Sequence, residues 1–388
     1  MKRTVFFVFL IVILFACHSE HEVDYPVLSV DITKMNVPSV FDIFEKIEII
    51  PLETTDNSLI GGEGVGIIDF YNNHYYILNG STQSFFCFDE HGKFVRKIGN
   101  RGLGPQEYNY ITDFIINNNV VELLSPWGFL YVYNLSGRFL NKTSLPMIVD
   151  NYQTSLIQDD SIRIFNYQDI MLLNDSIRIL TSSVDLNQDM LYVYSTRSNT
   201  IINSFYKNNY NIPAQVGKSY YQYNDSIFFY EPIVSKVFRI NQYGYEVAYA
   251  WDFGAMSPEN SRLEKDISSE RSFQLFESGQ MKGLLNRQFQ NENYYFTRST
   301  RIAKLYSNEI LHINILYDKR NNRAFVFEKF KEDLTFFPVF WNDEYVLASS
   351  HIYLKKAVDF TVLDEENRNK LKAITEDDNP FLIKYYFK

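Results

Sequence analysis

Two cysteines are the residues best suited to covalent chemistry, and they lie in very different surroundings. Cys17 follows a basic start, Met1-Lys2-Arg3, an almost purely apolar run from Thr4 to Phe15, and the small residue Ala16. A run of about a dozen apolar residues is short for a bilayer core of about 30 Å, but it suits the central part of a signal peptide. We therefore expect residues 1–16 to be a signal peptide that is cleaved before Cys17.

The segment Leu14-Phe15-Ala16-Cys17 resembles the lipobox of bacterial lipoproteins. The resemblance implies diacylglyceryl transfer to the thiol of Cys17, cleavage after Ala16 and acylation of the new amine. Several acyl chains would anchor the protein in a membrane far more firmly than one. The bulky Phe15 departs from the usual pattern, and a plain secretory signal with a chance cysteine is the alternative.

Residues 17–44 are expected to be a tether and a leading segment, since the stretch from His18 to Asp24 is polar and mildly acidic. In Bacteroides-type bacteria, a short acidic tract after the lipid cysteine can direct a lipoprotein to the cell exterior, but this tract is weak. The sequence therefore predicts an outer membrane lipoprotein and leaves open whether it faces the periplasm or the cell surface.

The remaining reactive side chains form no catalytic or metal-binding pattern. Cys87 lies in an alternating apolar run, Ser84 to Phe88, and is best interpreted as a small buried residue of a strand. The six histidines lack metal-ligand spacing, apart from His18 and His21 in the tether, and no Ser/His/Asp set or nucleophile elbow appears. We predict no metal, no cofactor and no catalytic residue.

A hairpin repeat dominates the rest of the chain. The segment from Phe88 to Phe94 matches Tyr133 to Phe139 at an offset of 45, including Gly92 and Gly137. A third copy runs from Val237 to Val247 around Gly244, and weaker copies lie at 191–195 and 324–328. Each glycine is expected to supply the positive φ of a tight turn.

A period of roughly 45–60 residues suits one four-stranded propeller blade. We therefore predict an all-β fold, a six-bladed β-propeller of four-stranded antiparallel blades over residues 45–388, with short helical inserts. The strands at 46–52 and 380–387 are candidates to close the ring together. The inserts are expected near 257–283 and at 364–374, where helix-start signals occur.

One longer segment carries a family resemblance. Phe88 to Tyr108, with Ile111-Thr112-Asp113-Phe114 after it, resembles the blade signature of NHL-type propellers and, more closely, the six-bladed TolB-like propeller lipoproteins of Bacteroides and its relatives. Glu48 to Thr54 and Asp377 to Pro380 also fit that family. The resemblance implies fold and export but no particular chemistry.

The same segment contains the only loop that we single out for ligand binding. Gly99, Gly102 and Gly104 could suggest a phosphate cradle, but Pro105 follows and no helix start does, so a blade-linking loop is preferred. In such propellers this region can face the central funnel. The ligand-binding candidates are therefore Lys97, Arg101 and Glu107, and a structural ion pair among them is the alternative.

The triplet Asp-Ser-Ile occurs three times, and in each copy Asp-Ser suits a turn and Ile is expected to start the next strand. These triplets also resemble the O-glycosylation acceptor of exported Bacteroides proteins. The resemblance makes Ser161, Ser176 and Ser226 candidate modification sites.

The charge balance excludes some partners. The formal net charge is −10, and loss of Lys2 and Arg3 with the signal peptide leaves it near −12. An acidic surface argues against nucleic acid and anionic lipid as main partners. We therefore expect a lipid-anchored envelope module that binds a peptide, a glycan or a partner protein. An envelope hydrolase or lyase with carboxylates in the central funnel is the alternative, and the oligomeric state stays open.

Overall fold

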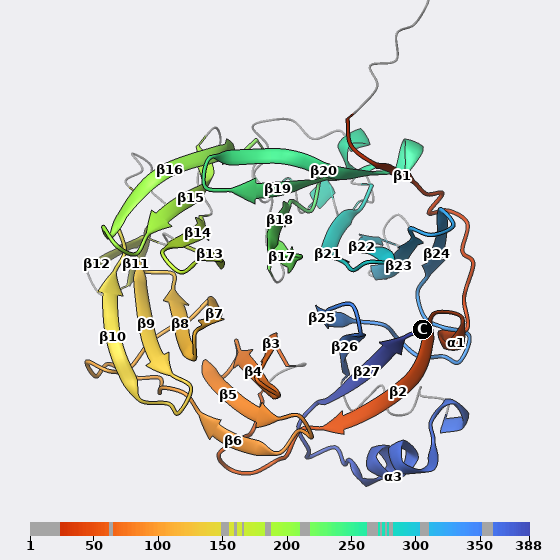
Figure 1. Ribbon diagram of the computed structural model, residues 1–388, viewed down its shortest axis with the longest axis horizontal. Helices are drawn as coiled ribbons and strands as arrows, with labels where there is room; N and C mark the ends of the chain where they lie inside the picture. Colours follow the sequence, from red (N-terminus) through yellow and green to blue (C-terminus); the bar gives the residue numbers. More distant parts are fainter. Residues whose placement is uncertain are drawn as a thin grey trace, which may run out of the picture.

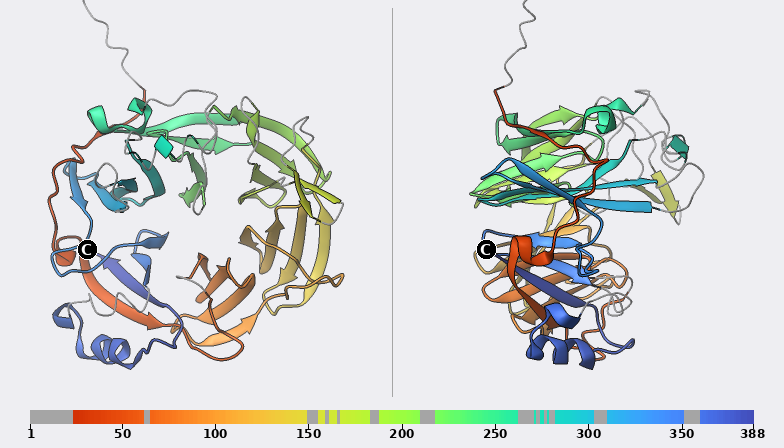
Figure 2. Two further views of the ribbon diagram at one scale, coloured as in Figure 1. Left: turned by 180° about the vertical axis from the view of Figure 1, so that it is seen from behind. Right: turned by 90° about the vertical axis from the view of Figure 1, so that its right-hand side faces the viewer.

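Six antiparallel sheets stand around a central axis and form a closed ring (Figure 1). The computed structural model describes residues 24–61, 65–148, 155–158, 161–164, 167–182, 188–209, 218–261, 271, 274–275, 278, 282–302, 310–350 and 360–388. Seen edge-on, the ring is a thick disc with a helix on its outer side (Figure 2). The predicted six-bladed β-propeller of four-stranded blades is confirmed.

Each blade runs from an inner strand at the axis to an outer strand at the rim. Blade 1 comprises β3 (Ile67–Tyr71), β4 (His74–Asn79), β5 (Ser84–Asp89) and β6 (Phe94–Lys97). Blade 2 comprises β7 (Asp113–Asn117), β8 (Val120–Ser125), β9 (Phe129–Asn134) and β10 (Phe139–Ser144). Blade 3 comprises β13 (Ile170–Asn174), β14 (Ile177–Thr181), β15 (Asp189–Ser195) and β16 (Thr200–Lys207). A separate hairpin, β11 (Ser155–Gln158) and β12 (Ser161–Ile164), lies between blades 2 and 3 in the sequence.

Blades 4 to 6 follow the same plan with two additions. Blade 4 comprises β17 (Tyr220–Tyr223), β18 (Ser226–Tyr230), β19 (Lys236–Asn241) and β20 (Gly244–Asp252). Blade 5 comprises β21 (Leu284–Gln290), β22 (Tyr294–Ile302), β23 (Ile310–Asp318) and β24 (Arg323–Phe327). Blade 6 comprises β25 (Pro338–Trp341), β26 (Tyr345–Ser350), β27 (Phe381–Phe387) and β2 (Phe44–Pro51). Blade 4 gains β1 (Val27–Ser29) as a fifth strand. In the described part of the chain, the helical elements are α1 (Val40–Ile43), α3 (Glu365–Ala373), three short 3-10 turns, Gly254–Met256, Pro258–Asn260 and Phe360–Val362, and helical residues at 271 and 274–275.

The two faces of the disc differ in their connections. On one, which we call the turn face, the first and second strands of several blades are joined by two-residue turns such as Asn72-Asn73, with φ of 48° and 58°. Asparagine tolerates the left-handed region that these turns require. The opposite face, which we call the loop face, carries the connections between blades, including the long one from β20 to β21.

The predicted glycine turns are confirmed in part. Gly92 and Gly137 have φ of 81° and 88°, and a Cβ on Gly92 would lie 2.1 Å from the carbonyl oxygen of Pro51. Gly244 is different because it already pairs with Asn241 as the first residue of β20, and its φ is not positive. The weak copy at 324–328 is out of phase, since β24 is the fourth strand of its blade, whereas the other copies are third strands.

The ring closes where the two ends of the propeller sequence pair. β2 lies antiparallel to β27, with Ile49 opposite Ile383, and forms the outer strand of blade 6. The prediction that these two segments share the closing region is confirmed. Asn379 reinforces the junction: its Oδ1 accepts from the amide of Ile60 at 2.7 Å, and its Nδ2 donates to the carbonyls of Glu53 and Ser58 at 2.9 and 2.8 Å.

Residues 24–43, the described part of the predicted tether and entry segment, pack on the rim of the ring. β1 pairs in parallel with β20, and Leu28, Val30 and Ile32 are buried. Farther along, the side chain of Asn36 accepts from the amide of Val326 and donates to the carbonyl of Ala324, which satisfies the edge of β24. From Pro26 onward the chain therefore covers the open edges of blades 4 and 5.

The two predicted helical inserts are described to different extents. α3 confirms the insert at 364–374, and it begins at Asp364, whose side chain accepts from the amide of Asn367 at 2.8 Å. Asn367 in turn accepts from the amide of Ile49 at 2.7 Å, so α3 covers the outer edge of β2. Near 257–283 the described residues show a short 3-10 turn at Pro258–Asn260 and helical residues at 271 and 274–275, which agree with the predicted insert, and most of the remainder lies outside the described residues.

Replacing Asn379 with Ala should destabilise the closed ring. The change leaves the amide of Ile60 and two carbonyls buried without partners, so we expect the free energy of unfolding to fall by roughly 2–4 kcal/mol. Urea unfolding followed by tryptophan fluorescence measures it. Asn141→Ala on the exposed side of β10 is the control and should change it by less than about 0.5 kcal/mol. Equal effects of the two substitutions would contradict this account of the closure.

Candidate binding channel

The inner strands of the six blades enclose a channel along the axis of the ring. A cavity of about 420 Å³ opens at the loop-face ends of these strands, and a second one of about 170 Å³ continues towards the turn face. The two share the lining residues Ile68, Lys218, Tyr220, Phe289 and Val339, which belong to four different blades or lie directly before them. The centre of a ring is a common place for a ligand, because groups from several elements converge there.

Lys218 and Asp113 form the electrostatic centre of this channel. The Nζ of Lys218 lies 2.9 Å from Oδ1 of Asp113, which is fully buried. Oδ2 of Asp113 accepts from the amide of Ile170 at 3.0 Å and from the hydroxyl of Tyr220 at 3.1 Å. The carboxylate of blade 2 thus links blades 3 and 4, so its hydrogen-bonding capacity serves the ring itself.

Asp169 makes a second link of the same kind. Its Oδ2 accepts from the hydroxyls of Ser219 at 2.6 Å and Thr181 at 3.1 Å. Burial, together with the negative charge of Asp113, raises the pKa of Asp169 to about 6. Burial likewise raises the pKa of Asp69, whose Oδ1 accepts from the amide of Phe70 at 2.8 Å.

Aromatic side chains surround the mouth of the larger cavity. Tyr110 is 39% exposed and contacts Trp127 edge-on, with ring centroids 5.9 Å apart. Tyr230 and Phe289 line the cavity deeper in. Flat aromatic faces beside a few fixed polar groups suit the binding of an organic ligand with both apolar and polar surfaces.

Glu231 lies next to this cavity and between blades 3 and 4. It is 5% exposed, and its Oε2 accepts from the hydroxyl of Tyr206 at 2.7 Å. Burial raises the pKa of Glu231 to about 7. The folded state therefore holds this proton more tightly than the unfolded chain does, which makes the stability of the ring dependent on pH.

Replacing Glu231 with Gln should stabilise the protein at pH 8 and change little at pH 4.5. A carboxyl group whose pKa rises from about 4.5 to about 7 on folding costs stability progressively as the pH rises through that window. Removal of the charge should therefore recover roughly 1–3 kcal/mol above pH 7. Thermal unfolding across that pH range measures the effect. The exposed Glu246→Gln on β20 is the control, and a gain independent of pH would contradict the assignment.

The three loop residues predicted to bind a ligand do not line the channel. Lys97 lies on β6, the outer strand of blade 1, with its ammonium 5.3 Å from the ring centre of Phe86. Arg101 is exposed, and Glu107 accepts from the amide of Gly104 at 2.9 Å. The prediction that they face the funnel is wrong, because the loop starts at the rim and only its end, Tyr110 to Thr112, reaches the cavity.

Two of the three glycines of that loop, Gly102 and Gly104, are explained by the same carboxylate. A Cβ on Gly102 would lie 1.9 Å from Oε2 of Glu107, and one on Gly104 would lie 2.9 Å from it. The preferred interpretation as a blade-linking loop agrees with these contacts. The alternative of a structural ion pair does not, since Glu107 folds the loop through a backbone amide.

The remaining predicted residues have varied positions. Ser176 and Ser226 are half-buried at equivalent hairpins of blades 3 and 4 on the turn face, while the side chain of Ser161 and the whole of Cys17 lie outside the described residues. Cys87 is 1% exposed, and burial raises its pKa to about 11, which confirms the interpretation as a buried strand residue. Glycosylation and lipidation stay predictions.

Two further observations concern the described part of the chain alone. Within it, no group of three or more His, Cys, Asp or Glu side chains lies close enough to hold a metal ion. No helix there combines the length and apolarity needed to cross a membrane.

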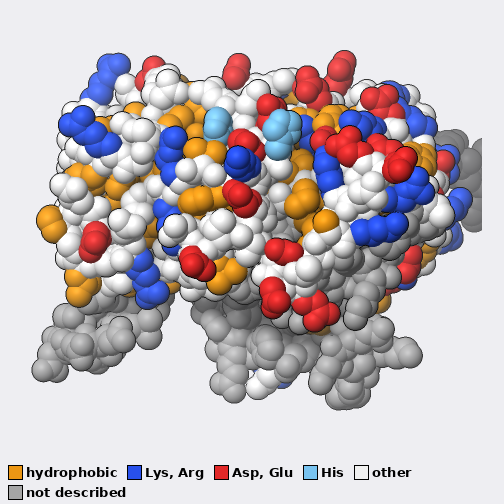
Figure 3. Space-filling view, turned by 90° about the horizontal axis from the view of Figure 1, so that it is seen from below, with side chains coloured by type: hydrophobic (Ala, Val, Ile, Leu, Met, Phe, Trp, Pro, Cys, Tyr) orange, Lys and Arg blue, Asp and Glu red, His pale blue; other side chains and the backbone are white. Residues whose placement is uncertain are grey.

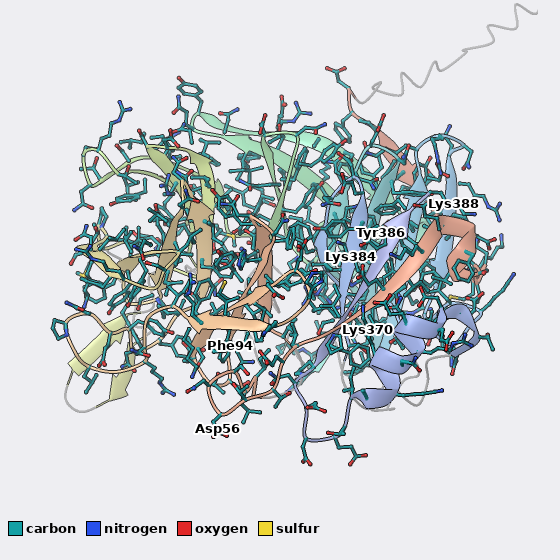
Figure 4. The ribbon with its side chains drawn as sticks, turned by 60° about the horizontal axis from the view of Figure 1, so that its bottom comes forward. Asp56, Phe94, Lys370, Lys384, Tyr386 and Lys388 are labelled. Atoms are coloured by element: carbon teal, nitrogen blue, oxygen red, sulfur yellow. The ribbon has the colours of Figure 1, made fainter. Side chains whose placement is uncertain are left out.

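The rim differs from the channel in its chemistry. Acidic and basic side chains are interspersed over the edge of the disc (Figure 3). At the closing blade, Glu48 accepts from the hydroxyl of Tyr386 at 2.7 Å and lies 4.0 Å from Lys370 of α3, and the ammonium of Lys384 stands 4.0 Å from the ring centre of Tyr345 (Figure 4). These contacts join α3, β2 and β27 and serve the closure of the ring.

Sequence reasoning missed the channel residues. Asp169, Lys218, Tyr220 and Arg287, and Asp113 beside them, come from segments spread over most of the chain, and only Asp113 stands in a segment that the sequence singles out. The only available signal was position, since each lies just before or within a first strand of a blade. Correct blade boundaries would have been needed to see it.

Comparison with known proteins places the fold in context. A family model described as Domain of unknown function (DUF4934) matches residues 27–386. A solved structure of a Bacteroides fragilis protein described as exported is similar, with a TM-score of 0.70 and 18% identity over 93% of this chain and 99% of that one. A member of the DUF4221 family from Bacteroides vulgatus has a TM-score of 0.52 and 15% identity over 89% and 97%. No curated protein matches this chain.

Proposed function

This chain belongs to the DUF4934 family, and we propose that it is a binding module whose ligand, a peptide, a glycan or part of a partner protein, occupies the central channel. The observation that carries the proposal is the cavity of about 420 Å³, whose lining residues belong to blades 1, 4, 5 and 6 or lie directly before blades 2 and 3. A rigid ring that presents converging side chains binds without having to order itself, which reduces the entropic cost of association.

The engagement of the carboxylates supports binding over catalysis. Asp113 and Asp169 are held by amides and hydroxyls of neighbouring blades, so they are not free to act on a substrate. The alternative, an envelope hydrolase or lyase, is supported by the raised pKa values of Asp69 and Asp169, which suit a general acid. Asp69→Asn would abolish turnover in that case, whereas a binding module would keep its ligand.

We further propose that the module is an outer membrane lipoprotein anchored through Cys17, facing the periplasm or the cell surface. β1 runs parallel to β20, which leads from the turn face to the loop face, so the chain approaches β1 from the turn-face side (Figure 2). Cys17 lies only nine residues before Pro26, a reach of about 30 Å at most. This geometry supports a membrane on the turn-face side and a channel mouth directed away from it.

The kinship with NHL-type and TolB-like propellers is proposed on narrower grounds. It is supported by the Gly-containing hairpin at Asp89 to Lys93 and by the loop that Glu107 folds after it. The Bacteroides fragilis protein of similar fold is described as exported, which agrees with an envelope location for this chain.

A photocrosslinker at the channel mouth should capture the ligand in native envelopes. We expect p-benzoylphenylalanine in place of Tyr110 to give ultraviolet-dependent adducts on the full-length protein, because this side chain stands beside the cavity. Gel mobility and mass spectrometry of the adduct detect it. The same probe in place of Tyr243, which is 82% exposed in a turn-face hairpin, is the control. Identical adducts from both sites, or none from Tyr110, would remove the support for a channel ligand.

The intact mass of the mature protein tests the predicted modifications together. We expect a chain that begins at Cys17 and carries acyl groups, and Cys17→Ala should lose both the acyl mass and membrane association. Additional mass that disappears when Ser161, Ser176 and Ser226 are replaced with Ala would establish O-glycosylation. A mass equal to the acylated polypeptide alone excludes the glycan, and an unprocessed N-terminus excludes the lipoprotein.

A further inference from the structure

One arginine is directed into the channel by an irregularity of its strand. β21 pairs with β22 through a register shift between Asn286 and Gln288, which leaves Arg287 as the extra residue. Arg287 has a φ of 57°, an uncommon conformation for a residue with a long side chain. Bulges of this kind re-aim a side chain and are common beside functional sites. Here the result is that Arg287 lines the larger cavity.

A second arginine lies close by on the adjacent strand. Arg298 of β22 is opposite Asn286 in the register, and its guanidinium stacks 4.8 Å from the ring centre of Phe337. Its Nε and Nη1 atoms are buried and have no hydrogen-bond partner. Burial, and then the charge of Arg287, lower the pKa of Arg298 to about 9, which agrees with two guanidinium groups held near one another.

Within the described part of the chain, neither guanidinium has a neutralising partner. Among the described residues the side chains of Arg287 and Arg298 form no ion pair, and the backbone of Arg287 hydrogen-bonds the phenol of Tyr230. The nearby carboxylates are committed elsewhere, since Asp113 pairs with Lys218 and Asp169 bonds to Ser219 and Thr181. A buried charge is costly unless it is paired. Two adjacent like charges that no described carboxylate neutralises favour an anionic ligand in the channel.

We propose that Arg287 and Arg298 are the anion-recognition groups of the channel and that its ligand carries an oxyanion, a carboxylate or a sulfate or phosphate group. This inference rests on the proposed function, because it names the chemistry of the channel ligand. The planar guanidinium fork matches a carboxylate or phosphate through two parallel hydrogen bonds. The phenol of Tyr230 lies within the same cavity and adds an apolar wall beside the charged groups. A cavity of about 420 Å³ has room for a small organic acid or the charged end of a longer ligand.

Thermal unfolding with simple anions tests the site. Sodium D-glucuronate and sodium sulfate are titrated into the full-length protein at constant ionic strength, with D-glucose as the uncharged counterpart of glucuronate. A ligand that binds only the folded state raises Tm in a saturable way, and we expect a rise of about 2 °C at ten times the dissociation constant. Glucuronate alone would indicate a carboxylate site, and sulfate alone a site for tetrahedral oxyanions.

Arginine variants separate this site from general salt effects. Sulfate stabilises most proteins by exclusion from their surface, so only the part of the Tm rise that is lost in Arg287→Gln counts. Arg287→Lys keeps the charge without the fork and should retain less than half of the rise. Arg239→Gln, which removes an exposed rim arginine paired with Glu246, should retain all of it. Arg298→Gln is a second variant, and Arg287→Gln decides alone if Arg298→Gln does not fold.

Two results would overturn the inference. One is a Tm rise that is the same in wild type and in Arg287→Gln, and the other is no saturable rise with either anion. The Tyr110 photocrosslinker keeps this failure distinct from failure of the proposed function. A captured ligand whose yield is unchanged by Arg287→Gln would leave the binding channel in place and remove its anion chemistry.

Discussion

β2 and β27 lie near opposite ends of the sequence and pair with each other, and this single pairing turns a row of blades into a ring. A blade has two apolar faces and can bury them only against its neighbours, so an open row would expose the faces of blades 1 and 6. The residues around the junction are correspondingly specialised. Asn379 fixes the segment that leads into β27, and Asn367 of α3 satisfies the outward-facing amide of Ile49 on β2. Farther back, Asn36 does the same for β24. Three buried or edge-bound asparagines thus supply hydrogen bonds that a seventh blade or a longer sheet would otherwise have to supply.

The channel is a consequence of that closure, because six inner strands that surround one axis leave space where their side chains do not meet. Contacts between neighbouring blades determine which side chains line this space and which groups they bind. Asp113 and Asp169 each satisfy groups of adjacent blades near the loop face, and Lys218 neutralises Asp113 at the point where the two cavities meet. The acidic groups of the channel are therefore part of its wall. On the other side, the bulge at Arg287 turns a charged side chain inward, where no carboxylate of the described residues forms an ion pair with it. This difference between the engaged acids and Arg287 underlies the anion preference that we propose for the channel.

Local patterns in the sequence were sufficient for the repeat but not for the site. The glycines at 92 and 137 and the apolar segments at 46–52 and 380–387 reveal hairpins and closure, because turn chemistry and strand alternation are short-range properties. The sequence predicts a tether and entry segment over 17–44 but gives no sign of β1, because this strand has only three residues, Val27–Ser29, and depends on its pairing with β20. Lys97, Arg101 and Glu107 stand in the longest motif of the sequence, yet the contacts of Glu107 within this motif fold a loop that starts at the rim. Arg287 left no signal, since a bulge depends on the register of two strands.

The acidic composition of the chain does not argue against an anionic ligand in the channel. A net charge of −10 spread over the surface repels large polyanions, whose many charges meet it together, and this is why nucleic acid is disfavoured. A single oxyanion inside the ring experiences mainly the groups within a few ångströms, because mobile ions screen exposed charges beyond about 8–10 Å. Arg287 and Arg298 lie in surroundings of low polarity, where their attraction for an anion is stronger than at the surface. The negative exterior and the two arginines therefore act at different distances, and under this proposal they favour a small or singly charged anion over a polyanion.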